Sequence, residues 1–372
     1  MSSYQVIMII MAVFFVIGAI DRCLGNRLGL GAEFEAGFFL MGKVALSIMG
    51  MICLAPALAD LLEPIVVPFF NRIKIDAAMF PSMILSPDSG GWDIARELSE
   101  DVAIADFSGL VVGAVIGGVV SFAIPAAVGL ISKEDTKYLA VGIMASFIVD
   151  PIGCFVGGLV QGLPVGLVIR CLLPVTVEGL LLAVGLATIP QIMIRGFQIL
   201  AKFLLWLMTF GLILGAVTKM TGYEIISGLC NIEEAFKRVG AIALLSAGTL
   251  PLIYTIKKVA KKPLEKLSVK TGIDSTALSF SLAAMASILP GFTVYHKMNV
   301  RGKIFLAGVT ASAANMLGPH LGFVSNANPE MIIPMMAAKI IAGVLAIPLA
   351  LWFGNRLFKD ELAAERAAQA AV

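Results

Sequence analysis

The stretch FSGLVVGAVIGGVVSFAIPAAVGLI, residues Phe107–Ile131, contains no charged residue. A helix crosses the hydrocarbon core of a bilayer with ~20 mostly apolar residues, so this stretch is long enough to span a membrane. Hydropathy predicts eight more spans of this kind, which indicates an all-α polytopic membrane protein with about nine spans. The other predicted spans are Tyr4–Ile20, Phe38–Leu62, Tyr138–Val160, Pro164–Ile189, Phe197–Val217, Val239–Ile256, Ile304–Val324 and Met331–Phe353.

The composition of the whole chain also favours a membrane protein. Of its 372 residues, 59% are hydrophobic and 14% are charged, whereas soluble domains are usually ~45–50% apolar and ~25% charged. A soluble fold of this length would expose much of that apolar surface to water. The composition therefore excludes a soluble enzyme and a nucleic-acid-binding protein, and the net charge of +2 implies nothing about acidic partners.

No sequence motif predicts catalysis, a metal site or a cofactor. The sequence lacks the GxxxxGKS/T, HExxH and GxSxG patterns of nucleotide, zinc-protease and serine-hydrolase sites. The two histidines lie far apart, with no ligand at metal spacing. The cysteines stand singly without a CxxC pair, so we expect small buried side chains rather than disulfides. They are Cys23, Cys53, Cys154, Cys171 and Cys230.

Glycines repeat at a spacing of four within several predicted spans. Small residues at this spacing let helices approach closely, so we expect packing seams rather than phosphate-binding loops. The seams are Gly109-xxx-Gly113-xxx-Gly117, Gly153-xxx-Gly157, Gly158-xxx-Gly162 and Gly211-xxx-Gly215.

The two halves of the chain resemble each other in sequence. A shift of 198 residues places Gly42 on Gly240 and Asp76 on Asp274, with further identical residues between them. This match predicts two repeats and a helix left over between them. The predicted segments are a first transmembrane repeat over 1–162, a connector helix over 163–196, a second repeat over 197–356 and a cytoplasmic tail over 357–372.

Charged residues predict that the two repeats have opposite orientations in the membrane. The stretch Lys257–Lys270 is rich in lysine, while the corresponding stretch of the first repeat carries Asp60 and Glu63. The stretch Asp88–Asp106 is acidic, while its counterpart around His296–Lys303 is basic. Because basic loops stay in the cytoplasm, we expect an inverted-topology repeat, with the N-terminus outside and the C-terminus inside.

Two short apolar pieces, Ala77–Leu85 and Ser275–Leu289, interrupt this pattern. If both are re-entrant, each keeps its two flanks on one side of the membrane, and protein surrounds the non-helical backbone. The alternative is an eleven-span protein with parallel repeats, in which both pieces cross the membrane.

Asp150 is an ionisable residue in the middle of a predicted span, within SFIVDPIGC. Charged side chains are costly in the hydrocarbon core, so each is a candidate functional residue. Pro151 and Gly153 follow, and we expect them to break the helix and free carbonyl groups beside the carboxylate. Such a site suits a small cation. The alternative is a structural pair with Lys339 or Arg170.

The motif MFPSMILSPDSGGWD, Met79–Asp93, places a carboxylate, a hydroxyl and an aromatic ring at the first re-entrant segment. Its prolines and glycines exclude a continuous helix. Asp88 offers charge to an ammonium group and Trp92 offers a cation–π contact, while Ser89 offers a hydrogen bond to a substrate hydroxyl. The alternative is a surface turn with Trp92 at the membrane interface.

The second repeat and the connector helix contribute three further candidates. The stretch AANMLGPHLGF, Ala313–Phe323, supplies Asn315 and His320. His320 is a candidate for proton relay near neutral pH, or it hydrogen-bonds within the bundle. Glu178, midway along the connector, is the other proton candidate, with substrate and structural roles equally open.

Several other charged residues favour a structural role. Lys43 lies within a predicted span and can pair with Asp60 or Glu178, and Lys339 can pair with Asp150. The acidic residues between positions 93 and 106 either concentrate cations at an outer mouth or form an ordinary solvated loop.

The chain resembles the ethanolamine-utilisation permease family of bacteria over nearly its whole length. The resemblance implies uptake of ethanolamine, which is mostly an ammonium ion at neutral pH, for a catabolic pathway often housed in a protein-shelled microcompartment. It implies no role for any particular residue, so the site predictions rest on physical argument. The segments that carry the resemblance are Gly37–Val66, Met79–Asp93, Ala145–Gly162 and Leu289–Phe323.

Together, the residues and the resemblance predict a multi-pass transporter of the bacterial inner membrane that imports ethanolamine by alternating access. Facilitated diffusion and coupling to H⁺ or Na⁺ both stay open, as does assembly into a homo-oligomer. We expect no cofactor and no nucleic-acid partner. The alternative function is a membrane scaffold or sensor that docks soluble partners through the lysines of Lys257–Lys270. The predicted substrate-binding residues are Asp88, Ser89, Trp92, Asp150, Asn315 and His320.

Overall fold

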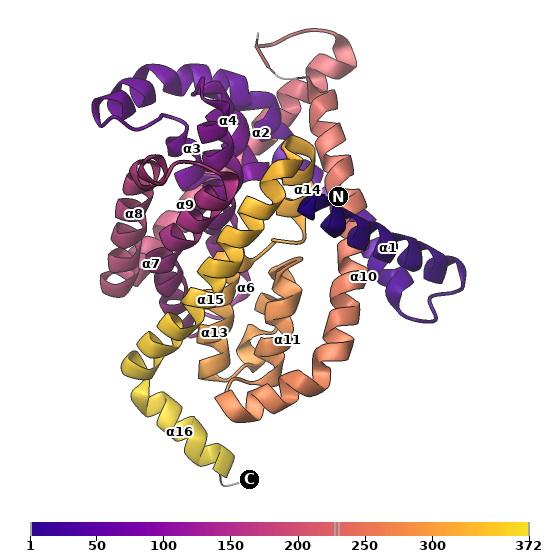
Figure 1. Ribbon diagram of the computed structural model, residues 1–372, viewed down its shortest axis with the longest axis vertical. Helices are drawn as coiled ribbons and strands as arrows, with labels where there is room; N and C mark the ends of the chain where they lie inside the picture. Colours follow the sequence, from indigo (N-terminus) through magenta and orange to yellow (C-terminus); the bar gives the residue numbers. More distant parts are fainter. Residues whose placement is uncertain (1, 227, 230, 371–372) are drawn as a thin grey trace.

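The protein is an all-α membrane protein, as predicted. The computed structural model describes residues 2–226, 228–229 and 231–370, and all regular structure in these ranges is helical (Figure 1). Within them, eight helical stretches are long and apolar enough to cross a membrane. They are α1 (Ser3–Cys23), α2 (Leu30–Arg72), Val102–Leu130, α7 (Thr136–Gln161), α8 (Val165–Thr188), α9 (Pro190–Thr221), α10 (Ile232–Thr271) and Pro329–Leu357, which contains α15 (Ile332–Leu357).

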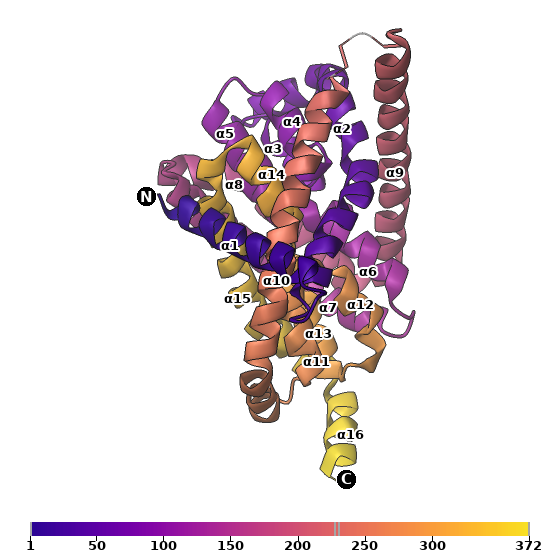
Figure 2. The ribbon, with the colours of Figure 1, turned by 90° about the vertical axis from the view of Figure 1, so that its right-hand side faces the viewer.

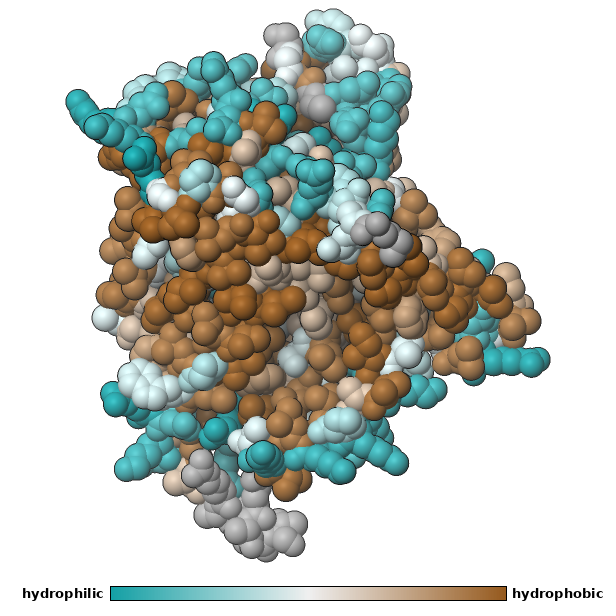
Figure 3. Space-filling view, viewed as in Figure 1, coloured by the Kyte–Doolittle hydropathy of each residue, from teal (hydrophilic) through white to brown (hydrophobic). Residues whose placement is uncertain are grey.

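The surface has the apolar belt of a membrane protein. Figure 3 shows hydrophobic residues across the middle of the molecule and hydrophilic residues gathered at its two ends. Helices α1 and α9 are the least buried of the long helices, with 17% and 28% of their most apolar windows inside the protein. Their exposed apolar side chains therefore face lipid rather than a protein core.

The predicted span Ile304–Val324 is wrong as a single helix. It divides into α13 (Val300–Ala313) and α14 (Pro319–Ala327), with a non-helical break at Ala314–Gly318. Asn315 has a φ of 59°, and proline disfavours helical backbone at the residue before it. These residues end α13 in the buried interior of the molecule.

The helix break predicted at Asp150 is also wrong, because α7 runs without interruption through Pro151. Proline removes one backbone hydrogen bond, and neighbouring helices can compensate for that loss inside a membrane protein. Helix α7 packs against α8, α13 and α15. The predicted lysine-rich loop Lys257–Lys270 is likewise helical, since it forms the last turns of α10.

Two short hairpins fill the remaining membrane depth. The first contains α3 (Met79–Ile84), the 3-10 turn η1 (Pro87–Ser89) and α4 (Gly91–Glu97). The second contains α11 (Ser275–Ala284) and α12 (Leu289–Thr293). At ~1.5 Å per residue, neither α3 nor α11 covers the ~30 Å hydrocarbon core. This geometry argues against the eleven-span alternative.

The elements of the two halves follow the same order at a separation close to 198 residues. Their ends also match: the Asp101 side chain caps the helix that begins at Val102, and the Asn299 side chain caps α13. Figure 2 shows α3, α4 and α5 (Val102–Asp106) near one end of the molecule and α11 and α13 towards the other. The corresponding elements are α2 and α10, α3 and α11, α4 and α12, the start of Val102–Leu130 and α13, and α7 and α15.

We name the two ends by the predicted orientation. The outer end carries α4, α5 and the α9–α10 turn, and the inner end carries the lysine-rich turns of α10 and α16 (Lys359–Ala370). The predicted tail is helical, as α16.

Corresponding stretches of the two halves differ in shape where they cross the middle of the protein. The second half has the break between α13 and α14. The first half is continuous there, but it passes through the wide π-helical turns η2 (Phe107–Gly117) and η3 (Val119–Ala123). Such turns are rare and are frequent at functional sites.

The glycines of the predicted seams make close contacts with neighbouring segments, with one exception. Gly153 of α7 faces Ala338 and Ala342 of α15, and Gly157 faces Ala338 and Pro334. Gly162 departs from the predicted seam: its φ is 94°, it ends α7, and no side chain or neighbouring backbone lies within 4 Å of the position that its Cβ would take.

The cysteines are buried as expected at three positions: Cys53, Cys154 and Cys171. Cys23 is exposed, because it lies at the last turn of the sparsely covered helix α1. Cys230 lies outside the described residues.

Candidate functional site

Four ionisable side chains from four different elements meet in the interior. We call Asp88 of η1, Asp150 of α7, His320 of α14 and Lys339 of α15 the central cluster. Lys339 interacts electrostatically with the other three. Asp150 is 0% exposed, Lys339 1% and His320 3%, and the Asp88 side chain is 14% exposed, so three members of the cluster are buried and the fourth lies nearer the surface. Three of the four were predicted as substrate-binding residues, and Lys339 was predicted to form a charge pair.

The ammonium group of Lys339 binds the end of the broken helix. Its Nζ donates a hydrogen bond of 2.8 Å to the carbonyl of Ala314, which lies at the C-terminal end of α13. The last carbonyls of a helix lack partners within the helix, and this end attracts cations. The break between α13 and α14 therefore creates a cation-binding position, which Lys339 occupies.

Asp150 has one oxygen with a partner and one without. Its Oδ1 accepts a hydrogen bond of 2.6 Å from the Ser312 hydroxyl on α13. Its Oδ2 is buried and has no hydrogen-bond partner within the protein. In the described residues no direct ion pair joins Asp150 to Lys339 or to Arg170, although Lys339 interacts with Asp150 electrostatically. A buried carboxylate oxygen without a partner is costly, which makes Asp150 open to a cationic ligand.

Asp88 and His320 meet across the two halves of the chain. Asp88 Oδ1 lies 3.9 Å from His320 Nε2 and accepts a hydrogen bond of 2.6 Å from the Ser86 hydroxyl. The hydroxyls of Ser86 and Ser89 are 2.8 Å apart. The Nδ1 atom of His320 is buried without a partner. The tip of the first hairpin thus presents a carboxylate and two hydroxyls to α14.

Asn315 shapes the break in the helix through its backbone. Its N–H donates to the carbonyl of Ala284 at 2.9 Å, and its own carbonyl accepts from the N–H groups of Gly318 and His320. These bonds tie the break to the second hairpin and fix where α14 begins. Asn315 therefore supports the position of His320, and its left-handed backbone suits asparagine.

Trp92 belongs to a separate polar network at the outer end. Its Nε1 donates to Asp106 at 2.7 Å, and its ring lies against Phe323. The guanidinium of Arg238 lies 5.2 Å from the ring centroid of Trp92, so the aromatic face predicted for a substrate ammonium is occupied by a cation of the chain itself. Asn328 donates to the other oxygen of Asp106 at 2.8 Å.

Arg238 completes this outer network, and the sequence analysis did not single it out. It forms an ion pair of 2.5 Å with Asp93, and both side chains are 11% exposed. The only sequence signal is a basic residue at the start of a predicted span, next to Val239. The outer network, defined as Trp92, Asp93, Asp106, Arg238 and Asn328, joins α4 and α5 to α10 and to the turn before α15.

A second network closes the inner end. Lys303 in the first turns of α13 forms an ion pair of 2.5 Å with Asp135, just before α7, and the two side chains are 12% and 7% exposed. Glu361 of α16 accepts hydrogen bonds from Lys137 and from the Tyr138 hydroxyl. We call Asp135, Lys137, Tyr138, Lys303 and Glu361 the inner network.

The remaining predicted residues lie apart from the central cluster. Glu178 is half-buried on α8, and its Oε2 has no hydrogen-bond partner within the protein. Lys43 and Asp60 both lie on the continuous helix α2. Their separation in sequence corresponds to about 25 Å along the helix axis, so the predicted pairing of Lys43 with Asp60 is wrong.

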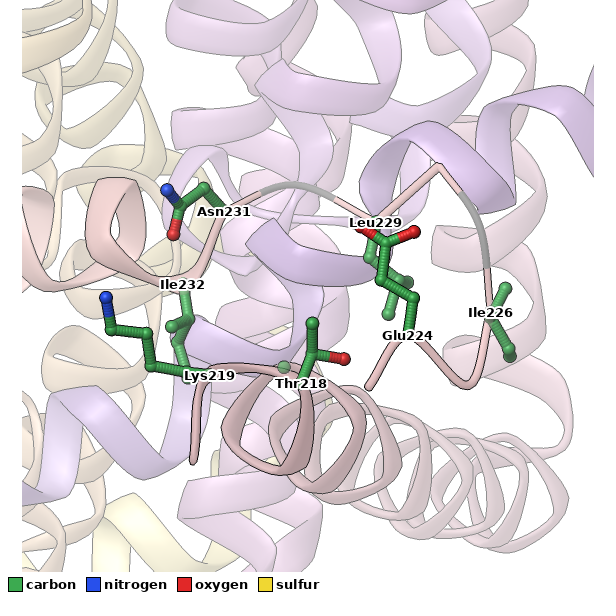
Figure 4. Close-up of a pocket in the computed structure, with 8 residues that line it drawn as sticks. Thr218, Lys219, Glu224, Ile226, Leu229, Asn231 and Ile232 are labelled. Atoms are coloured by element: carbon green, nitrogen blue, oxygen red, sulfur yellow. The ribbon is translucent and has the colours of Figure 1, made fainter. Parts of the chain in front are cut away.

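A surface pocket lies apart from the central cluster. Figure 4 shows a pocket of about 310 Å³ between the end of α9 and the start of α10, where Lys219, Glu224 and Asn231 are among the lining side chains. None of the predicted site residues lines it. This pocket is therefore separate from the central cluster.

These features define a polytopic α-helical membrane protein with a buried ionisable cluster, and such clusters mark substrate and ion pathways. The chain belongs to the family described as "Ethanolamine utilisation protein, EutH", whose model matches residues 4–353. It is a multi-pass protein of the bacterial inner membrane.

Curated relatives cover almost the entire chain. A protein of Listeria monocytogenes named "Probable ethanolamine permease EutH" is 40% identical over 99% of both chains. A protein of Salmonella typhimurium with the same name is 35% identical over 94% of this chain and 95% of its own. The "Uncharacterized protein YxeR" of Bacillus subtilis is 37% identical over 95% of each chain. No solved structure gives a significant match.

Proposed function

We propose that the protein imports ethanolamine and holds its ammonium group at the central cluster. Two of the relatives described above carry the printed name of a probable ethanolamine permease, and the chain aligns with them from end to end. The observation that carries the proposal is Asp150 Oδ2, a fully buried carboxylate oxygen without a hydrogen-bond partner within the protein. An ammonium donor satisfies this oxygen and neutralises its charge.

The roles of the other residues follow from their positions. Asp88 supplies the second carboxylate, and the hydroxyls of Ser86 and Ser89 beside it suit the hydroxyl of an amino alcohol. His320 approaches from the other half of the chain, and Asn315 holds the backbone that carries it. Trp92 acts at a distance from the amine, because its ring and its N–H are engaged in the outer network.

The transport cycle in this proposal is alternating access between two inverted repeats. Three observations support it: corresponding elements recur at a shift close to 198 residues, their hairpins lie towards opposite ends (Figure 2), and polar networks close both ends. Substrate sites in inverted-repeat transporters lie near the middle of the membrane, where helices are discontinuous. The α13–α14 break lies beside the central cluster, as this arrangement requires.

The test is uptake of radiolabelled ethanolamine into proteoliposomes at acidic external pH, where the neutral and membrane-permeant form is scarce. Asp150→Asn and Asp88→Asn should reduce uptake about 10–100-fold, because a hydrogen bond to a charged group contributes ~1.5–3 kcal/mol. Glu33→Gln at the start of α2 is the control, since it changes a half-buried carboxylate outside the cluster. Wild-type uptake by both aspartate variants would remove these carboxylates from the site.

A second candidate function is docking of soluble partners at the inner end. The observation in its favour is that Lys258, Lys261, Lys262 and Lys266 are exposed on the last turns of α10. Replacing these four lysines by glutamine separates the two functions. A transporter keeps its uptake in proteoliposomes, whereas a docking protein keeps its fold but loses its partner in cells.

A further inference from the structure

The central cluster contains more negative than positive charge. It has two carboxylates, Asp88 and Asp150, and one ammonium, Lys339, while His320 lies 3.9 Å from one of these acids and has an unpartnered ring nitrogen. With a neutral imidazole and the other groups ionised, one negative charge is left over. An uncompensated charge is very costly in a buried site, so one added monovalent cation stabilises the cluster.

The contacts of Asp150 favour it as the carboxylate that binds this cation. Lys339 faces it from α15, the Ser312 hydroxyl faces it from α13, and the Cys154 thiol lies one turn away on α7. The neighbouring helix α8 carries Glu178 and Arg170, neither of which forms an ion pair or hydrogen bond with Asp150 in the described residues. The other neighbour, η2, carries no ionisable residue. Asp150 Oδ2 is buried without a hydrogen-bond partner, whereas no oxygen of Asp88 is both buried and unpartnered in the described residues.

We propose that the central cluster binds one monovalent cation at a time, so that a primary ammonium ion and a proton compete for Asp150 and the protein exchanges one for the other. The identity of the ammonium ion rests on the proposed function. On the outer side, the ammonium binds the carboxylate and the proton leaves to water. On the inner side, the ammonium leaves and a proton returns. One positive charge moves in each direction, so the exchange carries no net charge.

This exchange makes a prediction for binding alone, without transport. In detergent-purified full-length protein, amine binding should release protons, approaching one proton per amine as the pH is lowered. The apparent Kd for ethanolamine should rise as the pH falls from about 8 to 5, with a limit of about tenfold for each pH unit. Radiolabelled ethanolamine measures the Kd, and a pH-indicator dye in weakly buffered solution measures the protons.

Two variants locate the proton. Asp150→Asn should abolish proton release and any remaining pH dependence of binding, and Glu178→Gln should leave both unchanged. Loss of proton release in Glu178→Gln or Asp88→Asn, with release preserved in Asp150→Asn, would overturn the assignment to Asp150. Because a variant can fail to fold, the pH titration of the wild-type protein is the primary test: a constant Kd with no proton release overturns the exchange.

A vesicle experiment separates exchange from transport of the bare cation. Protein-dependent uptake should be unaffected by a potassium diffusion potential set with valinomycin, and it should respond to a pH difference. Uptake that follows the potential would contradict exchange while leaving ethanolamine transport intact. The absence of both binding and uptake would instead contradict the proposed function.

Discussion

The outer and inner networks occupy corresponding places in the two halves, but they are built differently. Asp106 lies near the start of Val102–Leu130, as Lys303 lies near the start of α13. Asn328 comes just before α15, as Asp135 comes just before α7. At the outer end, the Asp106 carboxylate accepts hydrogen bonds from the Trp92 indole and the Asn328 amide. At the inner end, Lys303 and Asp135 form a single ion pair.

The two ends also differ in the additional contacts that surround these residues. At the outer end, Arg238 adds a largely buried ion pair with Asp93 and lies over two aromatic rings. At the inner end, the added contacts come from Glu361 on α16, a partly exposed tail helix. Exposed ion pairs contribute little, because water screens them and side-chain entropy opposes them. The outer end therefore has the stronger closure in this structure.

The largest effect is expected from breaking the buried ion pairs. Arg238→Ala leaves Asp93 unpaired at the outer end, and Lys303→Ala leaves Asp135 unpaired at the inner end. Loss of one partner of a buried pair costs ~3–5 kcal/mol, and a bias of about 1.4 kcal/mol already changes a population tenfold. Arg238→Ala should therefore open the outer side and Lys303→Ala the inner side, each by at least about tenfold.

Cys154 reports this opening, because it is buried next to the central cluster. In a background with Cys154 as the sole cysteine, a membrane-impermeant thiol reagent should label Arg238→Ala faster from outside and Lys303→Ala faster from inside. Lys219→Ala, which removes an exposed ion pair with Glu233, is the control and should match the background. Faster labelling of both variants from the same side would contradict the prediction that the two ion pairs close opposite ends of the protein.

A smaller effect is expected from the indole hydrogen bond of the outer network. Trp92→Phe keeps an aromatic ring beside Arg238 but removes the donor to Asp106, which is 4% exposed. Loss of a bond to a buried charged acceptor should lower the free energy of unfolding by about 1–3 kcal/mol. Denaturant unfolding in detergent measures the change. Trp206→Phe on α9, where the side chain is exposed, should cause no comparable loss.

The smallest effect is expected from the tail. The hydrogen bond from Lys137 lowers the pKa of Glu361 below its ordinary value of 4.5. Its contribution to stability is therefore present above about pH 4.5 and is lost as the pH falls through the lower, folded-state pKa. Glu361→Gln should cost at most about 1 kcal/mol at pH 7. Thermal unfolding should show this difference shrinking below pH 4.5, and a difference that grows in acid would contradict the pairing.

The span-length helices could be predicted from the sequence, since length and hydropathy determine which segments cross a bilayer. The broken span was harder, because averaging hydropathy over Ile304–Val324 conceals the effect of Gly318 and Pro319 on the backbone. The opposite error occurred at Pro151, where a local helix breaker is held within α7 by its tertiary neighbours. Local signals thus fail where packing decides the backbone.

The ionisable members of the central cluster could be identified because charges are rare in spans, but their neighbours could not. Ser312 is an ordinary small polar residue until it meets Asp150, 162 positions away in sequence. Arg238 meets Asp93 over 145 positions, and it also lies over the ring of Trp92. Long-range pairing of this kind requires the fold.

The close packing of α7 against α15 has a consequence for movement. Gly153 and Gly157 leave no room for side chains between these helices, and Asp150 and Lys339 lie along the same pair of helices. Sliding one helix past the other would disrupt backbone-level contact and move a buried carboxylate away from a buried ammonium group. The α7–α15 pair is thus suited to serve as a rigid frame, so that opening at either end falls to the hairpins and the helices around it.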